Sequence, residues 1–283
     1  MNKADAKKLI LNYFPNFEMD ELKKIGEGTG NVAFEVNSDL VFRFPKKEEN
    51  QKQLEREIAV QEILKDNSSL PIPDFSFLPD DHSFVGYKKL LGVPLLAVVN
   101  EFKGWDHFSK QIGSFLSGLH SISVQELEGL NVLREEKSFE DWKQSGKEFF
   151  EKIRSLVPKR YITQVETFFQ SALPNRTMDL VLCHNDLGIE HILVAENMVT
   201  GIIDWGGVVV TDPACDFARI YRDVGEQVMD TVLSEYTSIE AKREGLRERA
   251  IFYGKCLVFE DVFYGLEHNE YLQKALSALG WMF

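Results

Sequence analysis

The chain has 283 residues, which suits one two-lobed body with a shared cleft and is short for two independent domains. Hydrophobic residues make up 44% and charged residues 27% of it, a composition that indicates a folded globular protein and excludes a disordered one. The 32 basic and 45 acidic residues give a net charge of -13, which argues against nucleic acid or an anionic membrane as a partner and favours cations.

The cysteines and the apolar runs exclude further classes. The 3 cysteines form no C-x-x-C pair, and an odd number argues against both a disulfide framework and a structural zinc site. The first residues lack the unbroken apolar core of a signal peptide, and the longest apolar stretch, 90–99, reaches only about half of a membrane span. We therefore expect a cytoplasmic protein that does not bind membranes, and a monomer by default.

The N-terminal third predicts a helix and then a β-rich segment. Apolar spacing predicts a helix over 3–13, and alternation predicts two strands within 22–36, joined by a glycine-rich turn. The run LVFRF at 40–44 predicts a third strand, which completes an antiparallel meander. Strong helix formers over 48–65 predict a helix directly after it.

The rest of the chain changes character near Gly92 and Pro94. Before them, the runs DFSFL at 74–78 and SFVGYKKL at 83–90 predict two more strands on either side of a turn. After them, the pattern is mainly helical, with one β-rich island over 180–204. The predicted helices are 106–121, 138–156, 160–173, 225–237, 241–265 and 269–282.

The order of these elements predicts the fold class. Residues 1–92 form a small β-rich N-terminal lobe, and residues 93–283 form a larger, mainly helical C-terminal lobe. Helices and strands are segregated, so we predict a bilobal α+β fold and not the alternating βα order of a doubly wound sheet.

The β-rich island holds the residues with the clearest chemistry. A strand ends at Cys183, a polar loop carries His184 and Asp186, and a second short strand begins at His191; a later apolar run then delivers Asp204 before Trp-Gly. A single acid beside a strand is usually a cap or a surface residue. Two acids at the ends of neighbouring apolar strands are a more specific pattern, and they indicate one shared cleft.

This pattern resembles a known family. H-x-D followed by an apolar pair and D-W-G resembles the catalytic loop and metal-binding motif of the protein-kinase-like fold. CHNDLGIEHIL and GIIDWGGVVVTDPACDF resemble the antibiotic phosphotransferases, above all the aminoglycoside 2''-phosphotransferases and, more distantly, the macrolide kinases. The similarity extends through the glycine-rich turn, VFRFPK, LPIPDFSF, GYKKLLGVPL and GSFLSGLHSI, and so covers nearly the whole chain.

The resemblance implies a phosphotransferase that uses ATP or GTP with Mg²⁺. Asp186 would be the catalytic base that orients the attacking hydroxyl, and Asp204 would hold the magnesium ion. His191, five residues after Asp186, would lie on the metal side, where protein kinases have asparagine. We expect His184 to support the loop through packing and hydrogen bonds.

The nucleotide would be bound by the N-terminal lobe. The backbone of Gly26, Gly28 and Gly30 could approach the phosphates closely, because glycine has no side chain to obstruct them. Arg43 stands where the family has a lysine for the α- and β-phosphates, so the charge is kept but its shape changes from a point to a planar fork. Glu57 in the following helix matches the ion-pair partner of that basic residue.

Two further segments have roles that the resemblance implies. The nucleotide base would rest against the connection between the lobes, which includes Tyr87, Lys89 and Leu90; its side chains do not distinguish ATP from GTP. Asp212 and Asp216 would brace the catalytic loop, and Asp212 would also cap the helix that follows.

For the acceptor, the resemblance implies a small cationic molecule with a hydroxyl group, most directly an aminoglycoside. Carboxylates would then line the acceptor side, and the net charge agrees. Since most such acids are solvated helix residues, we expect two or three of them to contact substrate. The candidates are Glu190, Asp223, Glu226, Glu260, Asp261, Glu267 and Glu270.

Other functions fit the same residues. A macrolide kinase would need an exposed apolar groove, and a choline or sugar-alcohol kinase would fit the fold equally well. Arg43 in place of lysine leaves open a pseudokinase that binds nucleotide without turnover, and a purely structural role is a further alternative. Phosphoryl transfer by the purified protein separates an enzyme from the other two.

Overall fold

The structure, a computed structural model, describes all of the chain except residues 29, 136, 176–178, 239–244 and 267–268. Its N-terminal region is a four-stranded antiparallel sheet in the order β1-β2-β3-β4, with one helix before the sheet and one between its last two strands. These elements are α1 (Lys3–Tyr13), β1 (Leu22–Glu27), β2 (Asn31–Val36), β3 (Leu40–Pro45), α2 (Glu48–Asn67) and β4 (Val85–Lys88).

Strand alternation and aromatic packing build this sheet. Every second residue of β2 is buried, including Val32 and Phe34, as the period of a half-buried strand requires. These side chains join Phe42, Phe44 and Phe84 in a small core separate from that of the helical region. The sheet carries β3, on which Arg43 lies, in a fixed register between β2 and β4, and β3 is buried on both faces.

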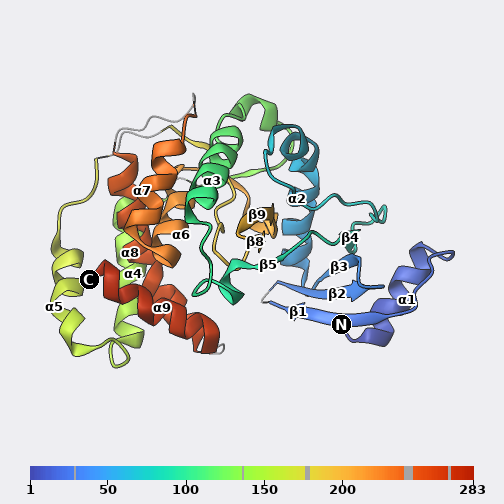
Figure 1. Cartoon of the computed structure of the whole chain (residues 1–283), viewed down its shortest axis with the longest axis horizontal. Coiled ribbons are helices and arrows are strands. Elements are labelled where there is room, and N and C mark those ends of the chain that lie inside the picture. Colours follow the sequence, from blue (N-terminus) through green and yellow to red (C-terminus); the bar gives the residue numbers. More distant parts are fainter. Residues whose placement is uncertain (29, 136, 176–178, 239–244, 267–268) are drawn as a thin grey trace.

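The C-terminal region is mainly helical (Figure 1). Its centre is α8 (Leu246–Gly265), which packs against helices on several sides and is buried along much of its length. The other helices are α3 (Trp105–Leu119), α4 (Phe139–Ile153), α5 (Lys159–Gln170), α6 (Ala214–Val224), α7 (Glu226–Glu235) and α9 (Asn269–Met282).

Two three-stranded sheets of short strands lie among these helices. One consists of β5 (Val93–Pro94), β8 (Ile192–Ala195) and β9 (Met198–Ile202), and Figure 1 shows it between α3 and α2. The other has the order β6 (Leu133–Arg134), β10 (Val209–Thr211) and β7 (Val181–Cys183). The loop from β7 to β8 and the turn after β9 hold the acids that the sequence singled out.

The predicted fold class is confirmed: a β-sheet N-terminal region precedes a mainly helical C-terminal region. The lobe boundary at residues 92 and 93 stays a prediction. Across the described part of the chain, no helix combines the length and apolar character that a membrane span requires.

The predicted strand over 74–78 is wrong. Ser76 N–H donates to the Asp74 carbonyl at 2.7 Å, which turns the backbone away from an extended course. Only Phe77 pairs with the sheet, exchanging two hydrogen bonds with Gly86 as an isolated bridge. The phenylalanines of this run are held by aromatic packing, Phe77 against Phe42 and Phe75 against Tyr87.

Two of the predicted helices begin at a glycine. The helix predicted over 225–237 corresponds to α7, and Gly225, with a φ of 86°, separates it from α6. Of the segment predicted over 241–265, α8 begins at Leu246 after Gly245, and residues 241–244 lie outside the described residues.

Candidate active site

The two acids of the motif converge on one histidine. His191 Nδ1 lies 3.5 Å from Asp186 Oδ2, and its Nε2 lies 3.7 Å from Asp204 Oδ2. The side chains of Asp186 and Asp204 are 42% and 44% exposed, whereas that of His191 is 18% exposed. The predicted catalytic base and the predicted metal ligands therefore share one partly open site.

The backbone holds both acids in a constrained arrangement. Asp204 and Asn185 have φ values of 62°, in the left-handed region that residues other than glycine seldom adopt. Asp216 fixes the backbone at Asn185, because its carboxylate accepts the backbone N–H of His184 at 3.0 Å and that of Asn185 at 2.7 Å. Strained backbone that the surrounding structure stabilises in this way is common at functional sites.

His184 supports the loop that carries Asp186 from the interior of the protein. Its side chain is fully buried, its Nδ1 accepts the Asp186 N–H at 3.3 Å, and its Nε2 lies 3.1 Å from the Ile203 carbonyl. The ring packs on Trp205, with centroids 4.6 Å apart. Burial lowers the pKa of His184, so the neutral ring that these contacts require is favoured.

Opposing influences set the protonation of the three site residues. Burial opposes ionisation of Asp186, but Arg219, whose Nη1 is 3.7 Å away, and His191 lower its pKa to about 2. Burial likewise opposes ionisation of Asp204, and Arg43 and His191 lower its pKa. For His191, burial favours the neutral form, but the two carboxylates raise its pKa. Both acids are thus ionised at neutral pH.

A buried ion pair joins the N-terminal sheet to this site. Arg43 donates to both carboxylate oxygens of Glu57, at 2.9 and 3.1 Å, and its Nη2 also lies 3.3 Å from Asp204 Oδ1. Burial raises the pKa of Glu57, an effect that Arg43 opposes, and burial raises the pKa of the neighbouring Tyr87 to about 12. The arginine that replaces the expected lysine therefore contacts both its helix partner and the predicted metal ligand.

The glycine-rich turn lies between β1 and β2. Gly28 N–H donates to the Asn31 carbonyl at 3.1 Å, and a Cβ added at Gly28 would meet no described atom within 4 Å. Gly26 lies within β1, and a Cβ at Gly30 would come within 3.1 Å of the Asn50 side chain. The turn is open at Gly28, as close approach of a phosphate requires, and the phosphate contact itself stays a prediction.

The residues predicted to contact the nucleotide base, at the end of β4 and just after it, have side chains in different surroundings. Tyr87 is buried beside Arg43, whereas Lys89 forms an ion pair with Glu35 on the sheet. Leu90 lies against Gly201 of β9, at 2.8 Å from the position of a Cβ there. Side-chain contact between Lys89 and a nucleotide would therefore require breaking its pair with Glu35.

The acids predicted to bind the acceptor lie in different surroundings. Glu190, Asp223 and Asp261 meet around Arg222, which is 2% exposed. Glu226 instead lies at the surface, 51% exposed and paired with Arg247. Glu260 is partly buried, and burial together with Asp261 raises its pKa. Glu267 and the side chain of Glu270 lie outside the described residues.

Sequence reasoning missed the cations of this site. Arg219 approaches Asp186, Arg222 binds Asp223, and Lys274 binds both Glu190 and Asp223. Arg219 and Arg222 are three residues apart on α6, a spacing that places them on one helix face and that could have indicated them. Lys274 gives no such signal, because it comes from α9, 84 residues after Glu190.

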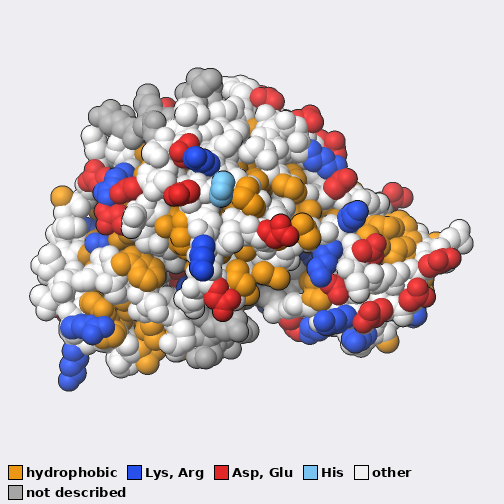
Figure 2. Space-filling view, in the orientation of Figure 1, with side chains coloured by type: hydrophobic (Ala, Val, Ile, Leu, Met, Phe, Trp, Pro, Cys, Tyr) orange, Lys and Arg blue, Asp and Glu red, His pale blue; other side chains and the backbone are white. Residues whose placement is uncertain are grey.

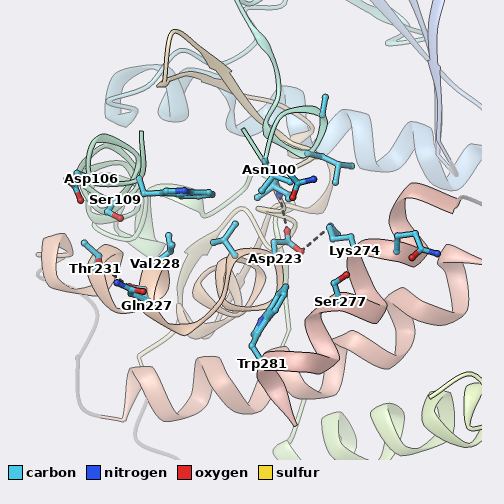
Figure 3. A pocket seen from close by; sticks show the side chains of 17 residues that line it. Asn100, Asp106, Ser109, Asp223, Gln227, Val228, Thr231, Lys274, Ser277 and Trp281 are labelled. Carbon is cyan, nitrogen blue, oxygen red and sulfur yellow. Dashed lines mark hydrogen bonds and ion pairs between the residues drawn. The ribbon is translucent and has the colours of Figure 1, made fainter. Parts of the chain in front are cut away.

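A cavity of about 950 Å³ adjoins the loop. It is bordered by Ile189 of the loop, by Trp105 and Ser109 of α3, and by residues of α6, α7 and α9 (Figure 3). The volume suits a drug-sized small molecule.

A deeper cluster belongs to the scaffold. Ligand atoms of His120, Cys183 and Asp216 lie within 4.8 Å of one another, and all three residues are buried. His120 already contacts Tyr236 at 2.9 Å and Asp216 at 3.0 Å, and Asp216 holds the loop backbone. Asp212 is similarly occupied, since it accepts from Arg249, from Tyr253 and from Ala214 N–H at the start of α6. Both predicted bracing acids thus lie beneath the site.

Comparisons with known proteins identify the fold and the family of the chain. The chain is 24% identical to a wild-type aminoglycoside 2'-phosphotransferase-IIIa, solved as its GDP complex, over 100% of this chain and 98% of that one, with a TM-score of 0.79. A macrolide 2'-phosphotransferase type I is 19% identical over 99% and 98%, with a TM-score of 0.66. At these identities the two structures show a shared fold. Uncharacterized protein YcbJ of Bacillus subtilis (strain 168) is 25% identical, covering 85% of this chain and 82% of that protein. The model of the phosphotransferase enzyme family matches residues 21–251, and the chain therefore belongs to that family.

Proposed function

We propose that this protein transfers the γ-phosphate of ATP or GTP to a hydroxyl of a small molecule, with Mg²⁺ as cofactor. The observation that carries the proposal is the convergence of Asp186 and Asp204 on His191 beside the Arg43–Glu57 pair. Family membership supports the reaction class, and the GDP complex of a similarly folded protein supports a nucleotide as donor.

Asp186 would act on the acceptor hydroxyl. Phosphoryl transfer depends mainly on alignment of the nucleophile and on charge stabilisation, so a carboxylate that accepts a hydrogen bond from the hydroxyl is sufficient. The low pKa of Asp186, about 2, keeps it ionised for this role and makes it a weak base. Its proton uptake is therefore expected late, as the phosphorus–oxygen bond forms.

Asp204 and His191 would hold the metal. Asp204 offers a partly exposed carboxylate, the ligand type that Mg²⁺ prefers. His191 Nδ1 is 2.7 Å from the Asp186 carbonyl, and donation there would leave Nε2 free on the side facing Asp204. A bound Mg²⁺ would neutralise charge on the β- and γ-phosphates. Arg43 is held by Glu57, and the Nη2 group of its guanidinium would face the same phosphates.

The acceptor that the resemblance implies is an aminoglycoside, and macrolide, choline and sugar-alcohol kinases remain alternatives. The pseudokinase alternative rests on Arg43, and it predicts nucleotide binding without turnover. An assay of the purified chain with Mg²⁺ and either nucleotide, against one acceptor from each class, decides among these functions.

The test of the site is Asp186→Asn. The variant should lower kcat by about 10²–10⁴-fold while nucleotide still raises the melting temperature as in the wild type. Asp66→Asn, an exposed acid of α2, should change neither measurement. Loss of nucleotide stabilisation in Asp186→Asn, or retention of full activity, would place the catalytic base elsewhere.

A further inference from the structure

Asp223, one of the two acids among the described residues that line the cavity, has no capacity left for a substrate. Asp223 is completely buried, and its Oδ1 lies 2.6 Å from Arg222 Nε and 3.1 Å from Lys274 Nζ. Its Oδ2 accepts from Arg222 Nη2 and from the Ile189 N–H, both at 2.9 Å. Each oxygen therefore has two donors, which is the usual limit of its lone pairs.

Lys274 occupies the position that a substrate ammonium would need. It reaches across from α9, is 10% exposed, and lies 2.9 Å from Glu190 Oε2 as well as 3.1 Å from Asp223. Figure 3 shows Lys274 beside Asp223, with a dashed line marking their contact. Among the described residues that line the cavity, Lys274 is the only lysine or arginine.

The remaining described lining has one further charged residue, Asp106 of α3, which is exposed and lies apart from Asp223 in Figure 3. The other lining residues are uncharged. Asn100, Gln227 and Thr231 offer amide and hydroxyl groups, and Trp281 offers an indole whose N–H already donates to the Tyr221 carbonyl at 3.2 Å. Such neutral donors and acceptors beside an aromatic face suit a ring compound with several hydroxyls. Ile189, in the wall, is only three residues after Asp186, so this occupant would lie next to the proposed catalytic loop.

Charge then decides which hydroxyl compounds can enter. The three carboxylates of Glu190, Asp223 and Asp261 face the two cations Arg222 and Lys274, so the cluster has a net charge of -1. A ligand ammonium that approached Asp223 or Glu190 would come within a few ångströms of the Lys274 ammonium, where like charges repel strongly because little water screens them. A ligand without ammonium groups meets no such repulsion.

We propose that Lys274 is a built-in counter-ion that makes this cavity select against polycationic acceptors, and that its acceptor is a polyhydroxylated compound with at most one positive charge. The proposal rests on the proposed function in one respect, that the cavity's occupant is the phosphate acceptor. It assigns Lys274 a role in specificity and none in the chemical step.

The experiment compares two ligands that share their hydroxyls but differ in charge: kanamycin, a polyamine, and kanamycin with all amines acetylated. Dissociation constants are measured by calorimetry for the full chain, for Lys274→Met and for Lys147→Met. Lys147 is an exposed lysine of α4 that does not line the cavity, so its replacement controls for the change in net charge.

The wild type and Lys147→Met should prefer the acetylated ligand. In Lys274→Met, the affinity for kanamycin should rise about tenfold or more and become steeply salt-dependent, reversing the preference. An affinity ratio that changes less than twofold, or no kanamycin binding by Lys274→Met, would overturn the proposal.

Separate measurements test the folding of each variant and the proposed function. Nucleotide-induced stabilisation, measured for each variant, confirms that the protein is folded and that its donor site is intact. If nucleotide fails to stabilise even the wild type, the proposed function fails, whereas the calorimetric comparison still decides the role of Lys274.

Discussion

The two charged clusters on either side of the proposed catalytic loop, on its proposed donor and acceptor sides, use the same residue types in opposite ways. On the donor side, Asp186 and Asp204 are 42% and 44% exposed, and their cationic neighbours stand 3.3–3.7 Å away. On the acceptor side, Asp223 is fully buried with cations at 2.6 and 3.1 Å, and Glu190 is 14% exposed. The donor-side carboxylates are partly exposed, as a proposed metal site requires, whereas Asp223 and Glu190 are paired with cations inside the protein.

The comparison teaches that a count of acids does not describe a binding site. The net charge of -13 favoured a cationic ligand, but Asp223, one of the two described acids that line the cavity, is paired with Arg222 and Lys274. Figure 2 shows that acidic and basic side chains are interspersed over this face of the molecule and form no single acidic field. A ligand's charge must therefore be judged from the groups left without a counter-ion.

The largest effect is expected on the donor side. Asp204→Asn removes the proposed carboxylate ligand of Mg²⁺, and the loss of several kcal/mol of charge stabilisation corresponds to a fall in kcat on the order of 10³-fold. Titration of activity with Mg²⁺ should show a much higher metal requirement. An unchanged requirement would mean that the metal is held by other residues and that the exposed carboxylate has another purpose.

The acceptor-side counterpart should lose stability. Asp223→Asn leaves Arg222 and Lys274 buried beside a neutral amide, and removing one partner of a buried ion pair costs about 3–5 kcal/mol of unfolding free energy, measured in urea. Burial opposes ionisation of Asp223, but Arg222 and Lys274 lower its pKa below the unfolded value of about 3.9. The stabilisation that the Asp223 carboxylate provides is therefore complete above that pH and declines at lower pH. The difference in unfolding free energy between variant and wild type should shrink only in acid.

A surface pair provides the control for this variant. Asp230 pairs with Arg247 and is 44% exposed, so Asp230→Asn should change the unfolding free energy by less than about 1 kcal/mol. If the two variants lost equal stability, the acceptor-side cluster would not differ from an ordinary surface pair.

The smallest effect is expected at Glu226, which the sequence predicted as an acceptor ligand. Its carboxylate is 51% exposed and paired with Arg247, outside the cluster around Arg222. Glu226→Gln should therefore change the KM for any acceptor by less than about twofold. A tenfold change in KM, with kcat unchanged, would extend the acceptor site to the first turn of α7.

Much of the fold could be predicted because its signals are local. Alternation of Val32 and Phe34 identified β2, since a strand's buried face repeats every second residue. The short apolar run LVFRF identified β3, which is buried on both faces. The strand predicted over 74–78 failed because its apolar side chains pack as an aromatic cluster while the backbone turns at Ser76. Short strands such as β6 and β10 carry too few residues to produce a periodic signal.

The sequence by itself determined the fold class and the placement of Asp186 and Asp204 in one site, because both acids follow apolar strands within one short segment. Only the tertiary structure decided which carboxylates remain available to bind a ligand. Lys274 reaches Glu190 from 84 residues away, and neither residue's own neighbours in the chain indicate that contact. The physical reason is that a carboxylate's affinity for a ligand depends on the counter-ions and the burial around it, and folding brings these from distant parts of the chain.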